Sequence, residues 1–253
     1  MKIKVLASGS KGNSTYIECD KTKLLIDVGI SLGKIVNFLE TIEVSPKEID
    51  AVLITHCHHD HISGLASFIK KTNALVYIPI DLLKDIKSIV PIDRIVIVKG
   101  EYNIEDINIK ILNASHDFTC FGYILTHQDS SLLYLTDTGY INSKYKELTK
   151  NKDIYIIEAN HDEKMLMEGP HPYPVKQRVI SDVGHLSNRY TGKYLAKCIG
   201  DKTQYIFLAH LSDKNNTPEL ALEQVREELA ETNFDPERII IADQYVASEE
   251  IEV

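Results

Sequence analysis

Seven residues of this 253-residue chain, THCHHDH at 55–61, limit its possible folds more than any other segment. The segment follows directly from IDAVLIT (49–55), an apolar run of strand length. It precedes ISGLASFIKKT (62–72), whose apolar residues have helical spacing. Histidines and carboxylates at this density usually bind metal. A histidine-rich surface turn is the alternative, and the strand-to-helix context disfavours it.

The spacing within the segment predicts four ligands and two spacers. Residues two apart at a strand end point in the same direction, so His56 and His58 face one site. Asp60 and His61 follow where the chain turns into the helix, and they face a second ion beside the first. The two spacers, whose side chains point elsewhere, are Cys57 and His59.

Three further residues stand directly after apolar, strand-like runs, where partner ligands are expected. His116 follows IKILNAS, Asp137 follows LLYLT, and His210 ends YIFLAH. The combined set supplies two ions: His56, His58 and His116 for one, Asp60, His61 and His210 for the other, with Asp137 as a bridge. Such nitrogen and oxygen ligands suit zinc, manganese or iron. We therefore predict two divalent metal ions.

The composition is that of an ordinary globular protein, with 43% hydrophobic and 26% charged residues. A net charge of −9 argues against a protein coated for nonspecific nucleic-acid binding. It does not exclude a nuclease, because carboxylates that hold cations lose their effective charge. From charge alone, the basic cluster Lys176, Arg178, Arg189 and Lys193 is interpreted as solvated surface.

Targeting signals are not expected. The start, MKIKVLASGS, enters a strand-like pattern at once, so no signal peptide is predicted. No segment approaches the roughly 18 apolar residues that a membrane span needs. Four scattered cysteines without a CxxC pair are typical of free thiols in a reducing compartment. These features predict a cytoplasmic protein with no membrane partner.

The order of the expected elements predicts two sheets. Strands are expected at 2–7, 14–19, 23–29, 49–55, 75–79, 154–159, 205–210 and 238–243, with several more between 95 and 137. Helices are expected near 32–40, 62–72, 80–90, 188–199 and 218–232. This order predicts an α+β fold with two mixed sheets face to face and helices outside, in one domain over residues 1–253. The stretch 167–185, which contains EGPHPYP, is interpreted as a long functional loop.

HxHxDH, a later histidine, the aspartate of TDTG and a final histidine together resemble the metallo-β-lactamase superfamily over nearly the whole chain. The resemblance implies a four-layered αβ/βα sandwich and a metal-dependent hydrolase. It also implies that Asp27, in LLIDVG, supports the metal loop from outside, and that Asp60 serves both the metals and catalysis.

The motifs IIEANH (156–161), GHLSN (184–188) and LAHLS (208–212), in this order, resemble the tRNase Z-like branch of that superfamily. The resemblance implies that His185 is a proton donor or a transition-state contact at the scissile phosphate and that Glu158 orients it. A glutamate–histidine pair raises the basicity of the imidazole and fixes its tautomer. Alternatively, His185 caps or packs at the start of the following helix.

More motifs look like the YycJ/WalJ group of 5′-to-3′ DNA exonucleases, among them SGSKGNSTYI, TDTGY, SDVGHLSN and NNTPELAL. This likeness implies a phosphodiesterase that acts on DNA ends, with two cations activating a water as hydroxide. One alternative is a phosphodiesterase of the same branch that acts on RNA or small cyclic phosphates. A glyoxalase-like thioesterase or lactonase is less favoured, since it gives the Glu158–His185 pair no role. A non-catalytic metal-binding scaffold should lack a ligand, and none is missing.

Several polar residues are predicted to contact the substrate. The SGSKGNS loop (8–14) offers Ser8, Ser10, Lys11 and Asn13 to a phosphate, although a hairpin turn explains this loop equally well. Asn160 and His161 adjoin the glutamate and are within reach of the site, although His161 could equally start a short helix. Lys176, in HPYPVKQR beside a tyrosine, is a predicted DNA contact.

Overall fold

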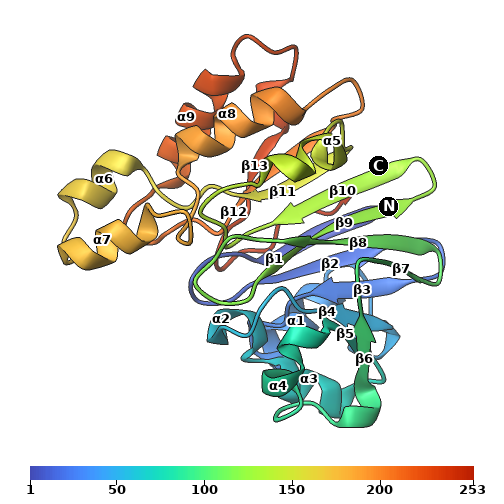
Figure 1. Ribbon diagram of the computed structural model, residues 1–253. Helices are drawn as coiled ribbons and strands as arrows, with labels where there is room; N and C mark the ends of the chain where they lie inside the picture. The colour runs from blue at the N-terminus through green and yellow to red at the C-terminus, as the bar shows by residue number, and fades with distance from the viewer. The chain divides into compact units, whose positions relative to one another are not determined.

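The computed structural model describes residues 1–253, which form fourteen strands and nine α-helices (Figure 1). The strands are β1 (Lys2–Ala7), β2 (Ser14–Glu18), β3 (Lys23–Ile26), β4 (Ala51–Leu53), β5 (Leu75–Pro79), β6 (Ile95–Val98), β7 (Glu101–Ile104), β8 (Ile107–Asn113), β9 (Phe121–His127), β10 (Ser130–Leu135), β11 (Ile154–Glu158), β12 (Tyr205–Ala209), β13 (Ile239–Ile241) and β14 (Ile251–Glu252). The helices are α1 (Leu32–Glu40), α2 (His59–Ile62), α3 (Leu65–Lys71), α4 (Leu83–Ile86), α5 (Lys146–Thr149), α6 (Glu163–Glu168), α7 (Tyr173–Val179), α8 (Asn188–Cys198) and α9 (Pro218–Leu229). Every helix is too short or too polar to serve as a membrane span.

The strands form two seven-stranded sheets, with the orders β14-β1-β2-β3-β4-β5-β6 and β13-β12-β11-β10-β9-β8-β7. Both are mixed: β1 and β2 are antiparallel whereas β3 and β4 are parallel, and β7 and β8 are antiparallel whereas β10 and β11 are parallel. The predicted α+β class with two mixed sheets is therefore confirmed.

The chain divides into two compact units. Unit 1 comprises residues 1–111, 125–129 and 243–253, and unit 2 comprises residues 112–124 and 130–242. The expectation of a single domain over residues 1–253 stays a prediction.

In unit 1, helical crossovers connect four parallel neighbours, β3, β4, β5 and β6. Asp27 directly follows β3 with a φ of 61°, and the motif segment begins two residues after β4 ends at Leu53. Because parallel strands end at the same edge of a sheet, Asp27 and the motif segment are brought together there.

The helix predicted over 62–72 is interrupted between α2 and α3. A Cβ on Gly64 would lie 2.0 Å from the carbonyl oxygen of Ile30, and the Gly64 N–H donates to the carbonyl of Val28 at 2.9 Å. The backbone of residues 28–30 therefore approaches too closely for any side chain at this position, and the chain bends there.

In unit 2, β10, β11, β12 and β13 run parallel. Every residue of β11 is buried, and Tyr155 and Ile157 belong to one hydrophobic core together with Leu195 of α8 and Val225 of α9. Helices α8 and α9 pack side by side (Figure 1), closely enough that a Cβ on Gly192 would lie 2.7 Å from Cβ of Glu228. This core fixes the strand ends of unit 2.

The interpretation of 167–185 as one long loop was wrong, because the stretch contains α7. Pro172 precedes the helix and Pro174 lies in its first turn. Proline is compatible with a helix there, because the N–H that it lacks would have no partner within the helix. The predicted helix at 80–90 is likewise shorter, and consists of a 3₁₀ turn at Ile80–Leu82 followed by α4.

Candidate active site

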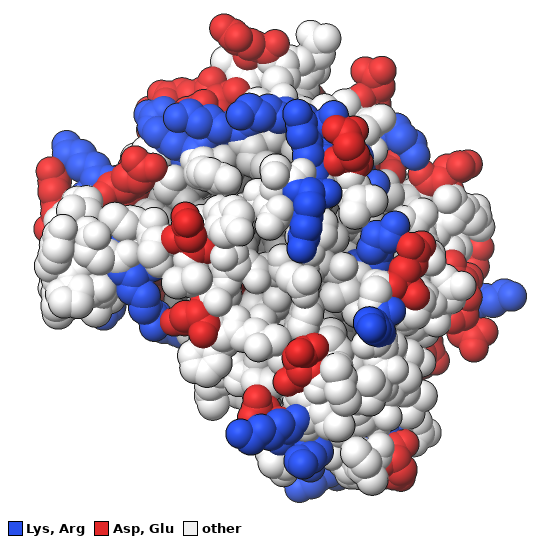
Figure 2. Space-filling model, viewed as in Figure 1, with Lys and Arg blue, Asp and Glu red and all other residues white.

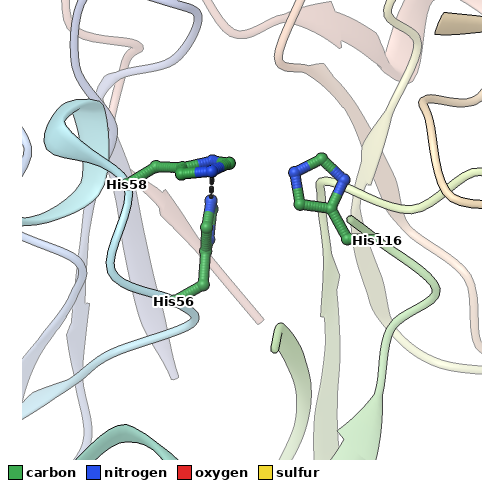
Figure 3. Close-up of side chains that lie close together, drawn as sticks. All are labelled: His56, His58 and His116. Atoms are coloured by element: carbon green, nitrogen blue, oxygen red, sulfur yellow. Dashed lines mark hydrogen bonds between the residues drawn. The ribbon is translucent and has the colours of Figure 1, made fainter. Parts of the chain in front are cut away.

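In unit 1 the histidine rings of the motif segment turn toward one another. Nε2 of His56 lies 2.9 Å from Nδ1 of His58 (Figure 3), and the ring centroids of His56 and His61 are 4.1 Å apart. His59 is exposed. Burial raises the pKa of the Cys57 thiol to about 12. His56, His58 and His61 therefore converge, whereas neither Cys57 nor His59 belongs to a group of side chains that lie close enough together to hold a metal ion.

Asp27 is fully buried and holds the motif segment by three hydrogen bonds. Its Oδ1 accepts the backbone N–H of Thr55 at 2.8 Å, and its Oδ2 accepts the Thr55 hydroxyl at 2.8 Å and Nδ1 of His61 at 2.7 Å. Burial raises the pKa of Asp27, and His61 and Thr55 oppose this by stabilising the carboxylate. With its proton on Nδ1, His61 presents a lone pair on Nε2, as metal-binding histidines do.

Replacing Asp27 with asparagine is expected to weaken metal binding about 10- to 100-fold, because the amide cannot accept hydrogen bonds at both of its atoms. Competition with a coloured chelator measures the affinity. Asp81→Asn, which changes an exposed carboxylate of unit 1, serves as the control. Unchanged affinity in Asp27→Asn would mean that His61 does not bind metal through a nitrogen that Asp27 orients.

Asn13 positions the motif segment, which differs from its predicted role as a substrate contact. Its side chain is fully buried: Oδ1 accepts the N–H of Gly9 at 2.8 Å, and Nδ2 lies 3.0 Å from Nε2 of His61. Ser8 is buried on the same loop, whereas Ser10 and Lys11 are exposed. Only this exposed part of SGSKGNS is open to a ligand.

In unit 2, three candidate residues stand at the ends of neighbouring parallel strands. Glu158 is the last residue of β11, His210 directly follows β12, and Asp137 follows β10 after one residue. Asp137 and His210 have φ values of 53° and 55°. This left-handed conformation is unusual for residues other than glycine and is often found at functional sites. Ligand atoms of Asp137, Glu158, His185 and His210 all lie within 4.8 Å of one another.

Glu158 is a fully buried carboxylate that joins two histidines. Its Oε1 accepts hydrogen bonds from Nδ1 of His185 at 2.7 Å and from Nδ1 of His210 at 2.8 Å. Its Oε2 accepts the backbone N–H groups of Thr138 at 3.1 Å and Leu186 at 3.0 Å. Burial would raise the pKa of Glu158, but the two histidines outweigh burial and lower it to about 2. The glutamate stays ionised and orients both rings.

His185 lies on the loop between α7 and α8. Burial would lower its pKa, but Glu158 and Asp137 outweigh burial and raise it, with Oδ1 of Asp137 3.9 Å from Nδ1. The cap of α8 is Ser187, whose hydroxyl accepts the N–H of Tyr190, so His185 does not cap the helix. A histidine with a raised pKa beside a carboxylate is suited to proton donation.

His116 follows β8, and its ring centroid is 5.2 Å from that of His185. Nδ1 of His116 lies 3.3 Å from the carbonyl of Gly184, a group that can only accept a hydrogen bond. The ring centroids of His185 and His210 are 5.4 Å apart. Three histidines therefore lie together in unit 2.

The other three predicted contacts of unit 2 are Asn160, His161 and Lys176. Asn160 is buried and donates to the carbonyl of His210 at 2.8 Å, so it positions the strand end. His161 is also buried; it does not start a helix, because α6 begins at Glu163. Lys176 is half-buried on α7 and donates to the carbonyl of Met167 at 2.6 Å.

Residues 7–210 match the Metallo-beta-lactamase superfamily. The chain belongs to this superfamily. Exodeoxyribonuclease WalJ of Streptococcus pneumoniae serotype 2 is 37% identical over 241 residues, which cover 92% of this chain and 90% of the relative. Exodeoxyribonuclease YycJ of Bacillus anthracis is 36% identical over 237 residues, with 91% and 89% covered. These matches confirm the predicted superfamily and the likeness to the YycJ/WalJ group.

The fold agrees with this assignment. The metallo-beta-lactamase fold protein YhfI from Bacillus subtilis superimposes with a TM-score of 0.72 at 15% identity, covering 98% of this chain and 99% of that protein. At this low identity the likeness concerns the fold alone. It confirms the predicted metallo-β-lactamase architecture.

The donor set of this metallo-β-lactamase chain fits divalent cations. Nε2 of His210 lies 3.5 Å from Oδ1 of Asp137, while Nδ1 of the same ring is directed at Glu158. When the ring is neutral, Nε2 presents a lone pair toward a carboxylate oxygen, an arrangement that a cation between them would stabilise. The nitrogens of His56 and His58 face each other in the same manner in unit 1.

Two threonines of the site were missed by the sequence reasoning. The Thr55 hydroxyl lies 3.1 Å from Nδ1 of His56, in addition to its bond with Asp27. Thr138 donates its N–H to Glu158 and accepts the N–H of Ser115 on its hydroxyl at 3.0 Å. Each threonine is next to a predicted metal ligand in the chain, and this position could have identified both as residues of the site.

Replacing Gly139 with alanine is expected to lower the free energy of unfolding by about 1–3 kcal/mol, the usual cost of overpacking. A Cβ there would lie 2.3 Å from the carbonyl oxygen of Ser181, so the loop that carries His185 must move and kcat should fall as well. Urea unfolding and steady-state kinetics measure the two effects. Gly33→Ala is the matched control, because nothing lies within 4 Å of its added Cβ. Unchanged kcat in Gly139→Ala would show that the loop position is not critical.

Proposed function

We propose that this chain is a metal-dependent phosphodiesterase that removes nucleotides from the 5′ ends of DNA. The observation that carries the proposal is the Glu158 carboxylate, which binds both His185 and His210. One acidic residue thereby orients a predicted metal ligand and, beside it, a histidine suited to proton transfer. The exodeoxyribonuclease relatives support DNA as the substrate.

We propose seven metal ligands for two divalent cations, zinc or manganese, with iron as a third candidate. His56, His58 and His116 would hold one cation, Asp60, His61 and His210 would hold the other, and Asp137 would serve both. When bound, the cations supply activation of the attacking water and neutralise charge on the phosphate. Asp27 orients His61, while Asp60 is both a ligand and part of the catalytic set.

His185 favours a phosphodiester substrate over a thioester. A thiolate leaves without a proton, because the pKa of a thiol is only about 8.5. The alkoxide that leaves a phosphodiester is far more basic and needs a general acid. Glu158 raises the pKa of His185 and so keeps a proton available for the leaving oxygen. A thioesterase gains nothing from this pair.

A row of basic side chains offers contacts for the DNA backbone. Figure 2 shows Lys and Arg side chains in a row over α8, although the net charge of the chain is −9. Lys193 and Lys197 are exposed on one face of α8, which begins three residues after His185. Arg178 and Arg189 form ion pairs with Asp117 and Glu227, as fits the interpretation of their cluster as ordinary surface. We therefore assign backbone contacts to Lys193 and Lys197 of α8, and not to the ion-paired Arg178 and Arg189.

A cytoplasmic location is also proposed. All four cysteines are free, and three of them are buried. Free thiols persist in a reducing compartment. Fractionation of the cells that produce the protein, followed by immunodetection, tests the location.

The test is an assay on 5′-labelled single-stranded and double-stranded DNA, with and without manganese. We expect the stepwise release of mononucleotides, and its loss after chelation. RNA of the same sequence, a cyclic nucleotide and a thioester are the competing substrates. Hydrolysis of the thioester without release of nucleotides would overturn the proposal, and faster cleavage of RNA or of the cyclic nucleotide would assign the chain to another substrate class.

A further inference from the structure

Unit 2 contains a pocket of about 310 Å³ that borders His185. Met167, Ile180 and Tyr190 form its apolar wall, and they remain 45%, 44% and 41% exposed. The polar part of its lining includes His161, Ser187 and His185 itself. Large apolar side chains left open beside catalytic groups are typical of a ligand site.

The walls of the pocket are connected to each other, so its shape is already formed. The Ser187 hydroxyl, at the start of α8, donates to Glu163 of α6 at 2.9 Å. Lys176 of α7 donates to the carbonyl of Met167 at the end of α6. Tyr190 lies in the first turn of α8, whose cap is Ser187. A preformed site loses little ordering entropy when it binds a ligand.

One buried polar atom in the lining needs a partner. Nδ1 of His161 has no hydrogen bond, although the residue is only 1% exposed. A buried polar atom without a partner costs free energy, which the ring recovers if it turns Nδ1 toward a ligand with a suitable polar edge. Burial lowers the pKa of His161 to about 4, so the ring is neutral and can either donate or accept.

The volume and the lining together limit the ligand. Ligand pockets usually measure about 300–1,000 Å³, so this one accepts a single small group. An apolar wall with one aromatic ring and a polar edge suits a flat heterocycle that carries hydrogen-bonding atoms. Nucleobases have this chemistry and stack on aromatic side chains whatever their sequence.

Hydrolysis of the first phosphodiester at a 5′ end, the reaction proposed above, places such a base beside His185. Water attacks phosphorus, the P–O3′ bond breaks, and the O3′ oxygen leaves with the proton from His185. O3′ belongs to the terminal nucleotide, whose sugar and base therefore start next to this histidine.

We propose that the pocket holds the base of the 5′-terminal nucleotide, stacked on Tyr190 and packed against Met167 and Ile180. This inference rests on the proposed function and adds the residues that grip the nucleotide about to be released. A base in this pocket can be neither paired nor stacked on its neighbour. Single-stranded or frayed ends are therefore the preferred substrates.

The experiment compares two single-stranded oligonucleotides that differ only at the 5′ nucleotide, which is thymidine in one and an abasic tetrahydrofuran residue in the other. Wild type is expected to show a kcat/KM about 5- to 150-fold higher on the thymidine end, the usual range for base stacking. Tyr190→Ala should lose this preference by slowing on thymidine alone, and Tyr190→Phe should keep it.

Ile180→Ala is expected to reduce the same preference, and Ile97→Ala is its matched control. Ile97 is also 44% exposed but lies on β6 of unit 1, so its loss should leave both rates unchanged. Binding of thymidine 5′-monophosphate and of deoxyribose 5-phosphate, measured by calorimetry, gives a readout without turnover. Tighter binding of the nucleotide by wild type, but not by Tyr190→Ala, is expected.

The possible failures are distinguishable. No release of nucleotides from either oligonucleotide by wild type overturns the proposed function. Equal kcat/KM on the two oligonucleotides by an active nuclease overturns the pocket assignment alone. Equal slowing of Tyr190→Ala on both ends also overturns it, because a general structural effect does not depend on the base.

Discussion

Replacing His185 with alanine is expected to lower kcat on a DNA end by about 10²- to 10⁴-fold, the usual contribution of a general acid. Both metal ions should stay bound, because the proposed ligand set does not include His185. Its Nδ1 is 2.7 Å from Glu158 and is directed away from solvent, so Nε2 is the nitrogen that can serve the leaving oxygen. Single-turnover cleavage and metal analysis of the same preparation measure the two quantities.

Two comparisons make the His185 result specific. His59→Ala removes an exposed histidine of the motif segment and should keep both activity and metal. A phosphodiester with p-nitrophenolate as leaving group needs no proton, so His185→Ala should hydrolyse it almost as fast as wild type does. Loss of metal from His185→Ala would instead make this residue a ligand, a role that its place in the four-residue cluster of unit 2 also allows.

Replacing Glu158 with alanine should have a larger effect, with no measurable turnover and about 3–5 kcal/mol less stability, the range for breaking a buried charged network. Alanine leaves two histidine N–H groups and two backbone N–H groups without their acceptor. Neither ring is then held in place. Urea unfolding and kinetics on the folded fraction measure both effects.

Asp153→Ala is the matched control for Glu158→Ala. Asp153 is a buried carboxylate just before β11, and Glu158 ends the same strand. Asp153 accepts the backbone N–H of Ser131 at 2.8 Å and the Ser131 hydroxyl at 2.7 Å. Asp153→Ala should also destabilise the protein but keep kcat in the folded fraction. If folded Glu158→Ala turned over DNA as fast as folded Asp153→Ala, Glu158 would not be the residue that orients His185 and His210.

The contribution of Glu158 to the free energy of unfolding should also depend on pH in the metal-free protein. Because its pKa is lowered from 4.5 to about 2, the carboxylate stabilises the fold above pH 4.5 and loses this effect as the pH falls towards about 2. The stability difference between wild type and Glu158→Gln should therefore shrink over this interval. Unfolding curves at several pH values measure it, and a constant difference would contradict the ionised, histidine-bound state.

Much of the fold could be predicted because its elements follow local patterns. The strands expected at 2–7 and 75–79 and the helix expected at 32–40 agree with β1, β5 and α1. A strand-like pattern predicted the two strands and an apolar face predicted the helix, since apolar side chains have to be buried. The sequence patterns gave wrong predictions at prolines and glycines, whose effects depend on context. The prolines of α7 were interpreted as loop residues, and Gly64 interrupts a helix that was predicted to be continuous.

By itself, the sequence determined the chemistry of the site: a histidine- and aspartate-rich segment after a buried strand, a later TDTG, and a glutamate and histidines that suit acid–base work. Only the tertiary structure decided how these groups act on one another. The parallel register of β11 and β12 sets Glu158 opposite Ala209, so one carboxylate reaches both His185 and His210. The tertiary structure also buries Asn13 and Asn160, which the sequence predicted to contact the substrate, and directs their side chains at the protein backbone. Register and burial arise from packing between residues far apart in the chain, and local spacing does not encode them.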